Sequence, residues 1–164
     1  MFKIFQEKKI PTKPNHDLIL KIKLELDQMV NLVNAALRLS TQDNPNIMEM
    51  EIIEARKRIE QARSEVQAGF ICFQNAFDMW PEGKPVFVEL NKFFENTSLF
   101  YNNLISWCEL IQSPSFDIFK TQDKSRYQNY VLKNRRFSTE IDFHFAKANE
   151  LLKQYTGIEL LPFE

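Results

Sequence analysis

The chain has 164 residues, a formal net charge of −1 at pH 7 and only three glycines. Its length suits one domain with a hydrophobic core and is short for two. So few glycines argue against a β-sandwich or a β-barrel, which need a tight turn roughly every ten residues. The near-neutral balance gives no whole-molecule attraction to nucleic acid or to an anionic membrane, so any such partner must meet a local patch.

The first 14 residues mix lysines with apolar side chains, and Pro11 and Pro14 prevent a continuous helix there. We expect an N-terminal arm over residues 1–14. It lacks the apolar run of a secretory signal, and no later stretch is apolar enough for a membrane span. We therefore expect a cytoplasmic protein without a membrane partner. Cys72 and Cys108 are interpreted as small buried hydrophobic residues rather than as a disulfide or a metal site.

A first helix is predicted over about residues 16–40, with Asn15 as its N-cap. Apolar residues at spacings of three and four support it, namely Leu18, Ile22, Leu26, Met29, Val33 and Leu37. Residues 20–26 also alternate between apolar and charged side chains, which is typical of a half-buried strand. Helix is favoured because no breaker separates this stretch from the helical pattern that follows. The strand alternative stays open.

Three further helices are predicted, each bounded by proline or glycine. Their ranges are about 45–79 (from Asn44 and Pro45 to Pro81), 85–112 (from Pro85 to Pro114) and 116–156 (ending at Gly157). A short turn at residues 115–119 is an alternative to the start of the last helix. Residues 157–164 form an apolar tail able to fold back on the body. Similar helix lengths and short connections favour antiparallel neighbours.

The predicted fold is therefore all-α and forms one domain over residues 1–164. It is an up-and-down antiparallel bundle of about four long helices, with an N-terminal arm and a short C-terminal tail.

Residues that carry chemistry are sparse. The ferritin-like metal site of helical bundles needs two Glu-x-x-His pairs, and neither His16 nor His144 has a glutamate three positions earlier. His144 lies at the edge of the apolar stripe of the last helix, as a hydrogen-bonded boundary histidine does. The nearest preceding arginine, Arg136, is eight positions away and about 80° around a helix, outside the Arg-x4–6-His spacing of HEPN ribonucleases. We expect no catalytic residue, no metal and no cofactor.

The clearest charge feature is the segment of residues 120–136, which has a net charge of +5 while the rest of the chain sums to −6. Cations with interleaved aromatic side chains suit a nucleic-acid backbone with exposed bases. The candidate nucleic-acid-binding residues are Lys120, Lys124, Arg126, Tyr127, Lys133, Arg135 and Arg136. The competing interpretation, a solvated helix face with its tyrosines in the core, stays open.

The apolar content also exceeds what four helix stripes need. Candidate partner-binding residues lie off the main stripes of the first and third helices, namely Leu20, Leu24, Phe94, Leu99, Tyr101 and Ile105. They are either buried beneath the arm and the tail or exposed to a partner.

This surplus supports the leading hypothesis, a non-enzymatic helical-bundle protein that acts by contact as an adaptor, assembly subunit or regulator. Its partner is another protein or a second copy of the chain. The alternative is a nucleic-acid-binding helical subunit of a ribonucleoprotein complex that uses residues 120–136. A divergent helical nuclease using His144 comes third.

Overall fold

The computed structural model describes residues 13–42 and 52–163, and these contain helices and no strand. The four long helices are α1 (His16–Leu37), α2 (Ile52–Met79), α3 (Lys84–Gln112) and α4 (Thr121–Thr156). A π-helical turn at Arg38–Gln42 extends α1, and a 3₁₀ turn at Pro81–Gly83 separates α2 from α3. The all-α prediction is confirmed.

The first helix runs without a break through residues 20–26, so the strand alternative is wrong. Asn15 caps it as predicted, because its side-chain oxygen accepts a hydrogen bond from the Leu18 amide at 2.8 Å. Ile22 and Leu26, one turn apart, are fully buried, whereas Leu20 and Leu24 are 53% and 69% exposed. The apolar residues of this stretch therefore lie on two faces of one helix, Ile22 and Leu26 on the buried face and Leu20 and Leu24 on the exposed face.

The predicted start of the second helix, near Asn44 and Pro45, lies outside the described residues, as does most of the N-terminal arm. The fourth helix begins at Thr121, later than the predicted start near residue 116. Its turn is held by side chains: Asp123 accepts from the amide of Asp117 at 3.0 Å, and Asp117 accepts from the amide of Phe119 at 3.0 Å. Aspartate caps of this kind compete with helix formation.

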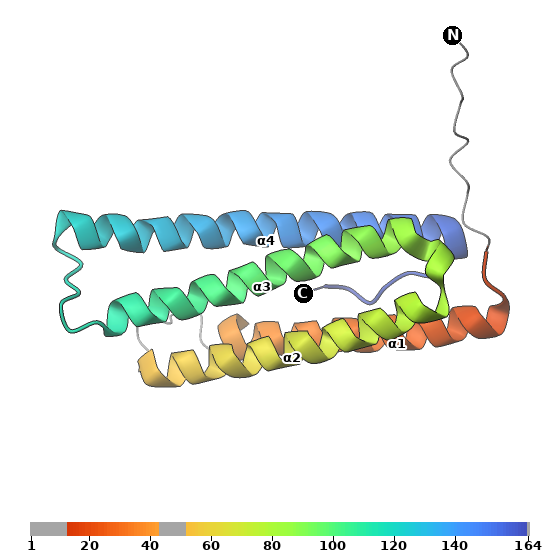
Figure 1. The fold of residues 1–164 in the computed structure, drawn as a ribbon, viewed down its shortest axis with the longest axis horizontal. Coiled ribbons are helices and arrows are strands. Elements are labelled where there is room, and N and C mark those ends of the chain that lie inside the picture. The colour runs from red at the N-terminus through yellow and green to blue at the C-terminus, as the bar shows by residue number, and fades with distance from the viewer. Residues whose placement is uncertain (1–12, 43–51, 164) are drawn as a thin grey trace, which may run out of the picture.

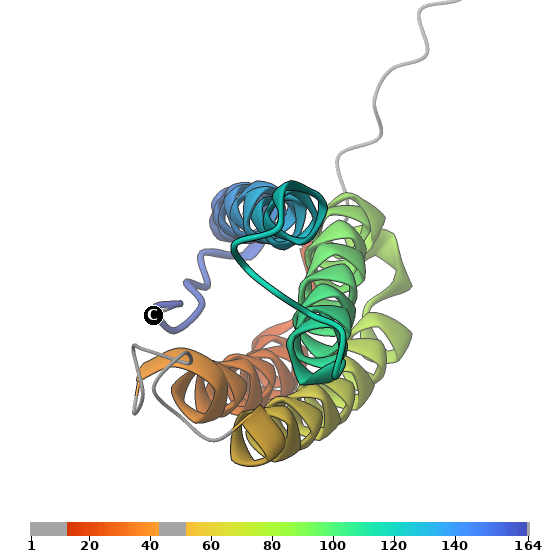
Figure 2. The same cartoon turned by 90° about the vertical axis from the view of Figure 1, so that its left-hand side faces the viewer.

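The four helices run up and down in chain order (Figure 1), and the pairs that pack extensively are consecutive ones: α1 with α2, α2 with α3 and α3 with α4. Viewed along the axis, they form an open arc with α1 and α4 at its two ends (Figure 2). The C-terminal tail, residues 158–163, returns along the side of the arc that α1 and α4 leave open.

The tail is attached by both apolar burial and hydrogen bonds. Ile158 and Leu160 are buried, and Asn149 of α4 accepts from the Leu160 amide at 2.8 Å. On the opposite wall, Asn34 of α1 donates to the Pro162 carbonyl at 3.1 Å. The reversal that starts the tail occurs at Gly157, whose φ of 75° lies in the left-handed region that favours glycine. The tail therefore links the two ends of the arc.

We expect Leu160→Ala to lower the free energy of unfolding by about 2–4 kcal/mol, because it removes a buried side chain and leaves a cavity on the side of the arc that, within the described chain, the tail covers. Urea titration measures this. The matched control is Leu132→Ala on α4, where the leucine is 61% exposed. That variant should change stability by less than about 0.5 kcal/mol, and equal losses for the two variants would contradict the structural role of the tail.

Candidate functional site

An apolar groove runs along the outer junction of α2 and α3. It consists of two hollows of about 550 and 330 Å³ that share Asn91 and Glu95. The apolar lining residues are Val66, Phe70, Phe73 and Phe77 from α2 and Phe87, Val88, Phe94 and Leu99 from α3. We call this feature the α2–α3 groove. Phe70, Val88 and Leu99 remain 37%, 42% and 49% exposed within it, so the groove is an apolar surface open to solvent.

Aromatic packing gives the groove a firm floor. Phe73 stacks on Phe94 with ring centroids 5.4 Å apart, and Phe70 meets Phe94 edge-on at 5.3 Å. Such pairs add about 0.5–1.5 kcal/mol beyond area burial. The α3 side of the groove carries its charges, with Lys84 and Lys92 on one hollow and Glu95 between the two. Ordered rings beneath a mixed polar rim are typical of a preformed contact surface.

The predicted partner-binding residues separate into two groups. Leu20, Leu24 and Leu99 are exposed, and Ile105 is half-buried. Phe94 and Tyr101 are only 3% and 1% exposed, so their apolar surface is used inside the bundle. For these two residues the burial alternative fits the structure, because α3 has helices on both sides.

Tyr101 is held in the interior by a hydrogen bond of its hydroxyl as well as by the packing of its ring. Its hydroxyl shares a hydrogen bond of 3.2 Å with Ser40 at the end of α1. Burial raises the pKa of Tyr101 to about 12, although the Ser40 hydrogen bond acts in the other direction. This polar contact is between buried groups and joins α3 to the α1 end of the arc.

The basic residues of segment 120–136 are all exposed on the first half of α4, that is Lys120, Lys124, Arg126, Lys133, Arg135 and Arg136. At about 100° per residue, Lys120, Lys124 and Arg135 fall on one flank of the helix, whereas Arg126 and Lys133 fall on the other. Tyr127 is half-buried and packs on Trp107 with centroids 5.7 Å apart. The basic side chains are therefore spread around the solvent-facing side of α4, whereas Tyr127 faces α3.

His144 belongs to a buried polar cluster between α3 and α4. Its Nδ1 lies 2.6 Å from Glu89 Oε2, and its Nε2 lies 3.3 Å from Glu140 Oε2. The short contact to a carboxylate oxygen requires a proton on Nδ1. Lys147 adds a contact of 3.3 Å to the other Glu89 oxygen. The contact between His144 of α4 and Glu89 of α3 is therefore a polar cross-link between the two helices.

Burial alone would raise the pKa of Glu89, but hydrogen bonds from His144 and Lys147 and the nearby charge of Lys92 outweigh it. The pKa of Glu89 is consequently below its ordinary value of 4.5. Sequence reasoning missed Glu89, although a signal was present: it is the one acid within the apolar run from Val86 to Leu90.

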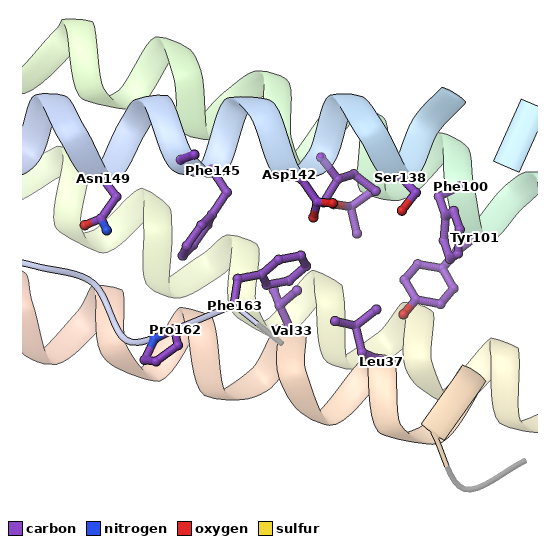
Figure 3. Close-up of a pocket in the computed structure, with 13 residues that line it drawn as sticks. Val33, Leu37, Phe100, Tyr101, Ser138, Asp142, Phe145, Asn149, Pro162 and Phe163 are labelled. Carbon is purple, nitrogen blue, oxygen red and sulfur yellow. The ribbon is translucent and has the colours of Figure 1, made fainter. Parts of the chain in front are cut away.

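A second cavity, the inner pocket, opens between α1, α3 and α4 beside the end of the tail. Its volume is about 600 Å³, and its apolar walls include Val33, Leu37, Phe100, Ile141, Phe145 and Phe163. In Figure 3, Ser138 and Asp142 point from α4 into the space toward α1. Asp142 is exposed, and partial burial against the pocket wall raises its pKa. Sequence reasoning did not find this pocket, because it depends on the separation of α1 from α4.

Comparison of the chain with protein-family models, with curated proteins and with solved structures finds no match. Within residues 13–42 and 52–163, no three His, Cys, Asp or Glu side chains are placed to hold a metal ion. None of the helices described is both long and apolar enough to cross a membrane. The site must therefore be interpreted from its own geometry.

The lowered pKa of Glu89 makes a prediction about acid stability. The contribution of the ionised Glu89 carboxylate to the free energy of unfolding is complete above pH 4.5. It is lost as the pH falls through the lower pKa of Glu89 in the folded state. We expect Glu89→Gln to be less stable than wild type by about 1–3 kcal/mol at pH 7, because charged hydrogen bonds are lost. The difference in free energy of unfolding between wild type and Glu89→Gln should become smaller below pH 4.5, as measured by urea titrations at a series of pH values. An exposed control, Glu150→Gln, should stay near wild type, and a pH-independent gap for Glu89→Gln would contradict the assignment.

Proposed function

We propose that this protein is a non-enzymatic assembly subunit or adaptor that acts by contact through the α2–α3 groove. The observation that carries the proposal is the groove itself, where phenylalanine, leucine and valine side chains stay exposed over an ordered aromatic floor. Partly exposed aromatic and aliphatic anchors in preformed hollows are typical of protein interfaces. Contiguous apolar surface of this kind is uncommon on a protein with no partner.

The occupant we propose is a second copy of the chain. Along α3 the groove extends from Lys84 to Leu99, a length of about 22 Å at 1.5 Å per residue. A two-fold axis near residues 91 and 92 places residues 84–99 of one copy antiparallel to residues 84–99 of the other. Glu95 of each copy then lies opposite Val88, which is flanked one helical turn away by Lys84 and Lys92. The charges of the groove are thus complementary to themselves, as an isologous interface requires.

The proposal includes a cytoplasmic location. It is supported by two free thiols, Cys72 and Cys108, both buried. Burial raises the pKa of the Cys108 thiol to about 11 and also raises that of Cys72, so neither is poised for oxidation.

We expect the wild-type protein to sediment as a dimer at micromolar concentration and Leu99→Lys to shift it to monomer, because residue 99 lies opposite Lys84 of the other copy and the new lysine would meet a like charge. Sedimentation equilibrium over a concentration series measures the change. The matched control, Leu132→Lys on α4, introduces the same charge at an exposed leucine outside the groove and should remain dimeric. A strictly monomeric wild type would rule out the second copy as occupant.

Charge reversal tests the register of the two copies. Glu95→Lys alone should weaken the dimer, because each new lysine would meet Lys84 and Lys92 of the other copy. Adding Lys84→Glu to the same chain, which leaves the contact between Lys92 and Glu89 intact, should restore part of the lost association. If the double variant associates no better than Glu95→Lys in the same sedimentation series, the antiparallel register is wrong.

A second candidate function is RNA or DNA binding by residues 120–136, and the exposure of all six cations favours it. The half-buried position of Tyr127 and Tyr130 supports contacts to phosphates rather than stacking on bases. Binding of this kind would be sequence-independent and would weaken as salt rises.

Replacing Lys124, Arg126, Lys133, Arg135 and Arg136 with alanine should abolish binding to single-stranded RNA in a fluorescence titration. The slope of log affinity against log salt concentration should also become shallower by roughly 0.7 for each phosphate that is no longer neutralised. The control removes as many cations elsewhere, namely Lys21, Arg56, Lys57, Arg58 and Arg63, and should bind as wild type does. Unchanged affinity in the first variant would exclude this function.

A further inference from the structure

The inner pocket has a buried floor and an exposed rim (Figure 3). The floor consists of the buried lining residues, namely Val33, Thr97, Tyr101, Ile141 and Phe145. The rim consists of the exposed lining residues of α4, which repeat every four positions along one flank of the helix, namely Ser138, Asp142 and Ala146. The pocket is therefore open to solvent along α4 and apolar at its base.

The size of the pocket suits a small organic molecule. Its volume of about 600 Å³ lies within the usual range of roughly 300–1,000 Å³ for such sites. An apolar cavity of only about 150 Å³ is enough to bind benzene. Along α4 the lining extends from Ser138 to Asn149, a length of about 16 Å at 1.5 Å per residue. The pocket can therefore hold an elongated molecule.

The wall beside the tail is held in place by contacts within the chain. Phe145 contacts Phe93 with ring centroids 5.5 Å apart and Phe163 with ring centroids 5.2 Å apart. The Pro162 carbonyl accepts a hydrogen bond from Asn34 at 3.1 Å. A ligand does not have to order this wall, which removes part of the entropic cost of binding.

The polar groups on the floor are paired within the protein. The Thr97 hydroxyl donates to the Phe93 carbonyl at 2.7 Å, and the Tyr101 hydroxyl shares a hydrogen bond of 3.2 Å with Ser40. Burial raises the pKa of Tyr101 to about 12, so its hydroxyl is uncharged at pH 7. The floor therefore offers a ligand apolar contact and no ion pair.

The rim favours a ligand without charge. Asp142 is exposed, so its carboxylate is solvated by water and a cation beside it would gain little. An anion beside it would be repelled. None of the described residues that line the pocket is a lysine or an arginine, so an anion would gain no ion pair in return.

We propose that the inner pocket binds an uncharged molecule with an apolar body and a small polar end, such as a long-chain alcohol. The body lies on the buried floor against the phenylalanine rings, and the polar end stays at the rim in contact with water. Burial of apolar surface supplies the affinity. None of the described residues lines both this pocket and the α2–α3 groove, so the site is independent of the proposed dimer.

The test is titration calorimetry on the full chain at pH 7, with n-hexanol, n-octanol and n-octanoate as probes. The affinity for n-octanol should exceed that for n-hexanol by roughly 15-fold, because each buried methylene group contributes a factor of about four. The affinity for n-octanoate should be lower than that for n-octanol, because its carboxylate would lie beside Asp142. If n-octanol does not bind, or if n-octanoate binds as tightly as n-octanol, the proposal is wrong.

Matched variants identify the surface that holds the alcohol. Ser138→Phe places a ring over the floor and should lower the affinity for n-octanol at least tenfold. Ser125→Phe changes an exposed serine on the same helix, outside the pocket, and should bind n-octanol as wild type does. Leu99→Lys alters the α2–α3 groove and should also leave the affinity unchanged. Wild-type affinity in Ser138→Phe, or loss of binding in Leu99→Lys, would overturn the proposal.

Far-ultraviolet circular dichroism and a thermal melt establish that each variant is folded. If Ser138→Phe does not fold, Ala146→Phe at the same rim takes its place, with the same expected loss of n-octanol affinity. Wild-type affinity in folded Ala146→Phe would then contradict the proposal.

Discussion

The arrangement depends on one constraint: α3 must be buried on two sides. It packs on α2 and on α4, while α1 and α4 do not close the bundle against each other. The two inner helices of the arc, α2 and α3, each pack on two neighbours and so need a wider apolar surface than the two outer helices. The chain meets this demand with 13 buried residues along α3. Because the arc is open, the C-terminal tail must supply the remaining apolar cover, and the position of each candidate site follows from this geometry.

The contact between α3 and α4 contains a buried polar cluster. Glu89 and His144 are both buried, and a buried carboxylate is costly unless its oxygens are paired. Here both oxygens have partners, from His144 and Lys147. A satisfied cluster of this kind fixes how one helix slides along the other, since any shift leaves a buried charge unpaired. Apolar side chains alone would tolerate such a shift more easily.

The four helices could be predicted because the spacing of apolar residues and the positions of capping and helix-breaking residues agree. Asn15 caps α1, Pro81 separates α2 from α3 and Gly157 ends α4. The sequence did not show which of the apolar residues outside the main stripes stay exposed. Leu99 and Tyr101 both lie off the main stripe of α3, yet one is 49% exposed and the other 1%. Periodicity gives the direction of a side chain around its own helix but not which neighbour lies there. The inner pocket was hidden for the same reason, since it requires residues from α1, α4 and a tail far away in the sequence.

The two faces of α3 meet at a pair of adjacent rings. Phe94 lines the α2–α3 groove, and Phe93, in contact with it at 5.2 Å, also touches Phe163 of the tail at 5.5 Å. Proximity alone does not couple two sites, because a ligand shifts an equilibrium only through a difference in affinity between two states. Within the described chain, the tail is the element that both lines the inner pocket and touches Phe93. It is held by the buried side chains of Ile158 and Leu160, by hydrogen bonds and by ring contacts. Any influence of the inner pocket on the outer groove would therefore pass through Phe163 and the position of the tail.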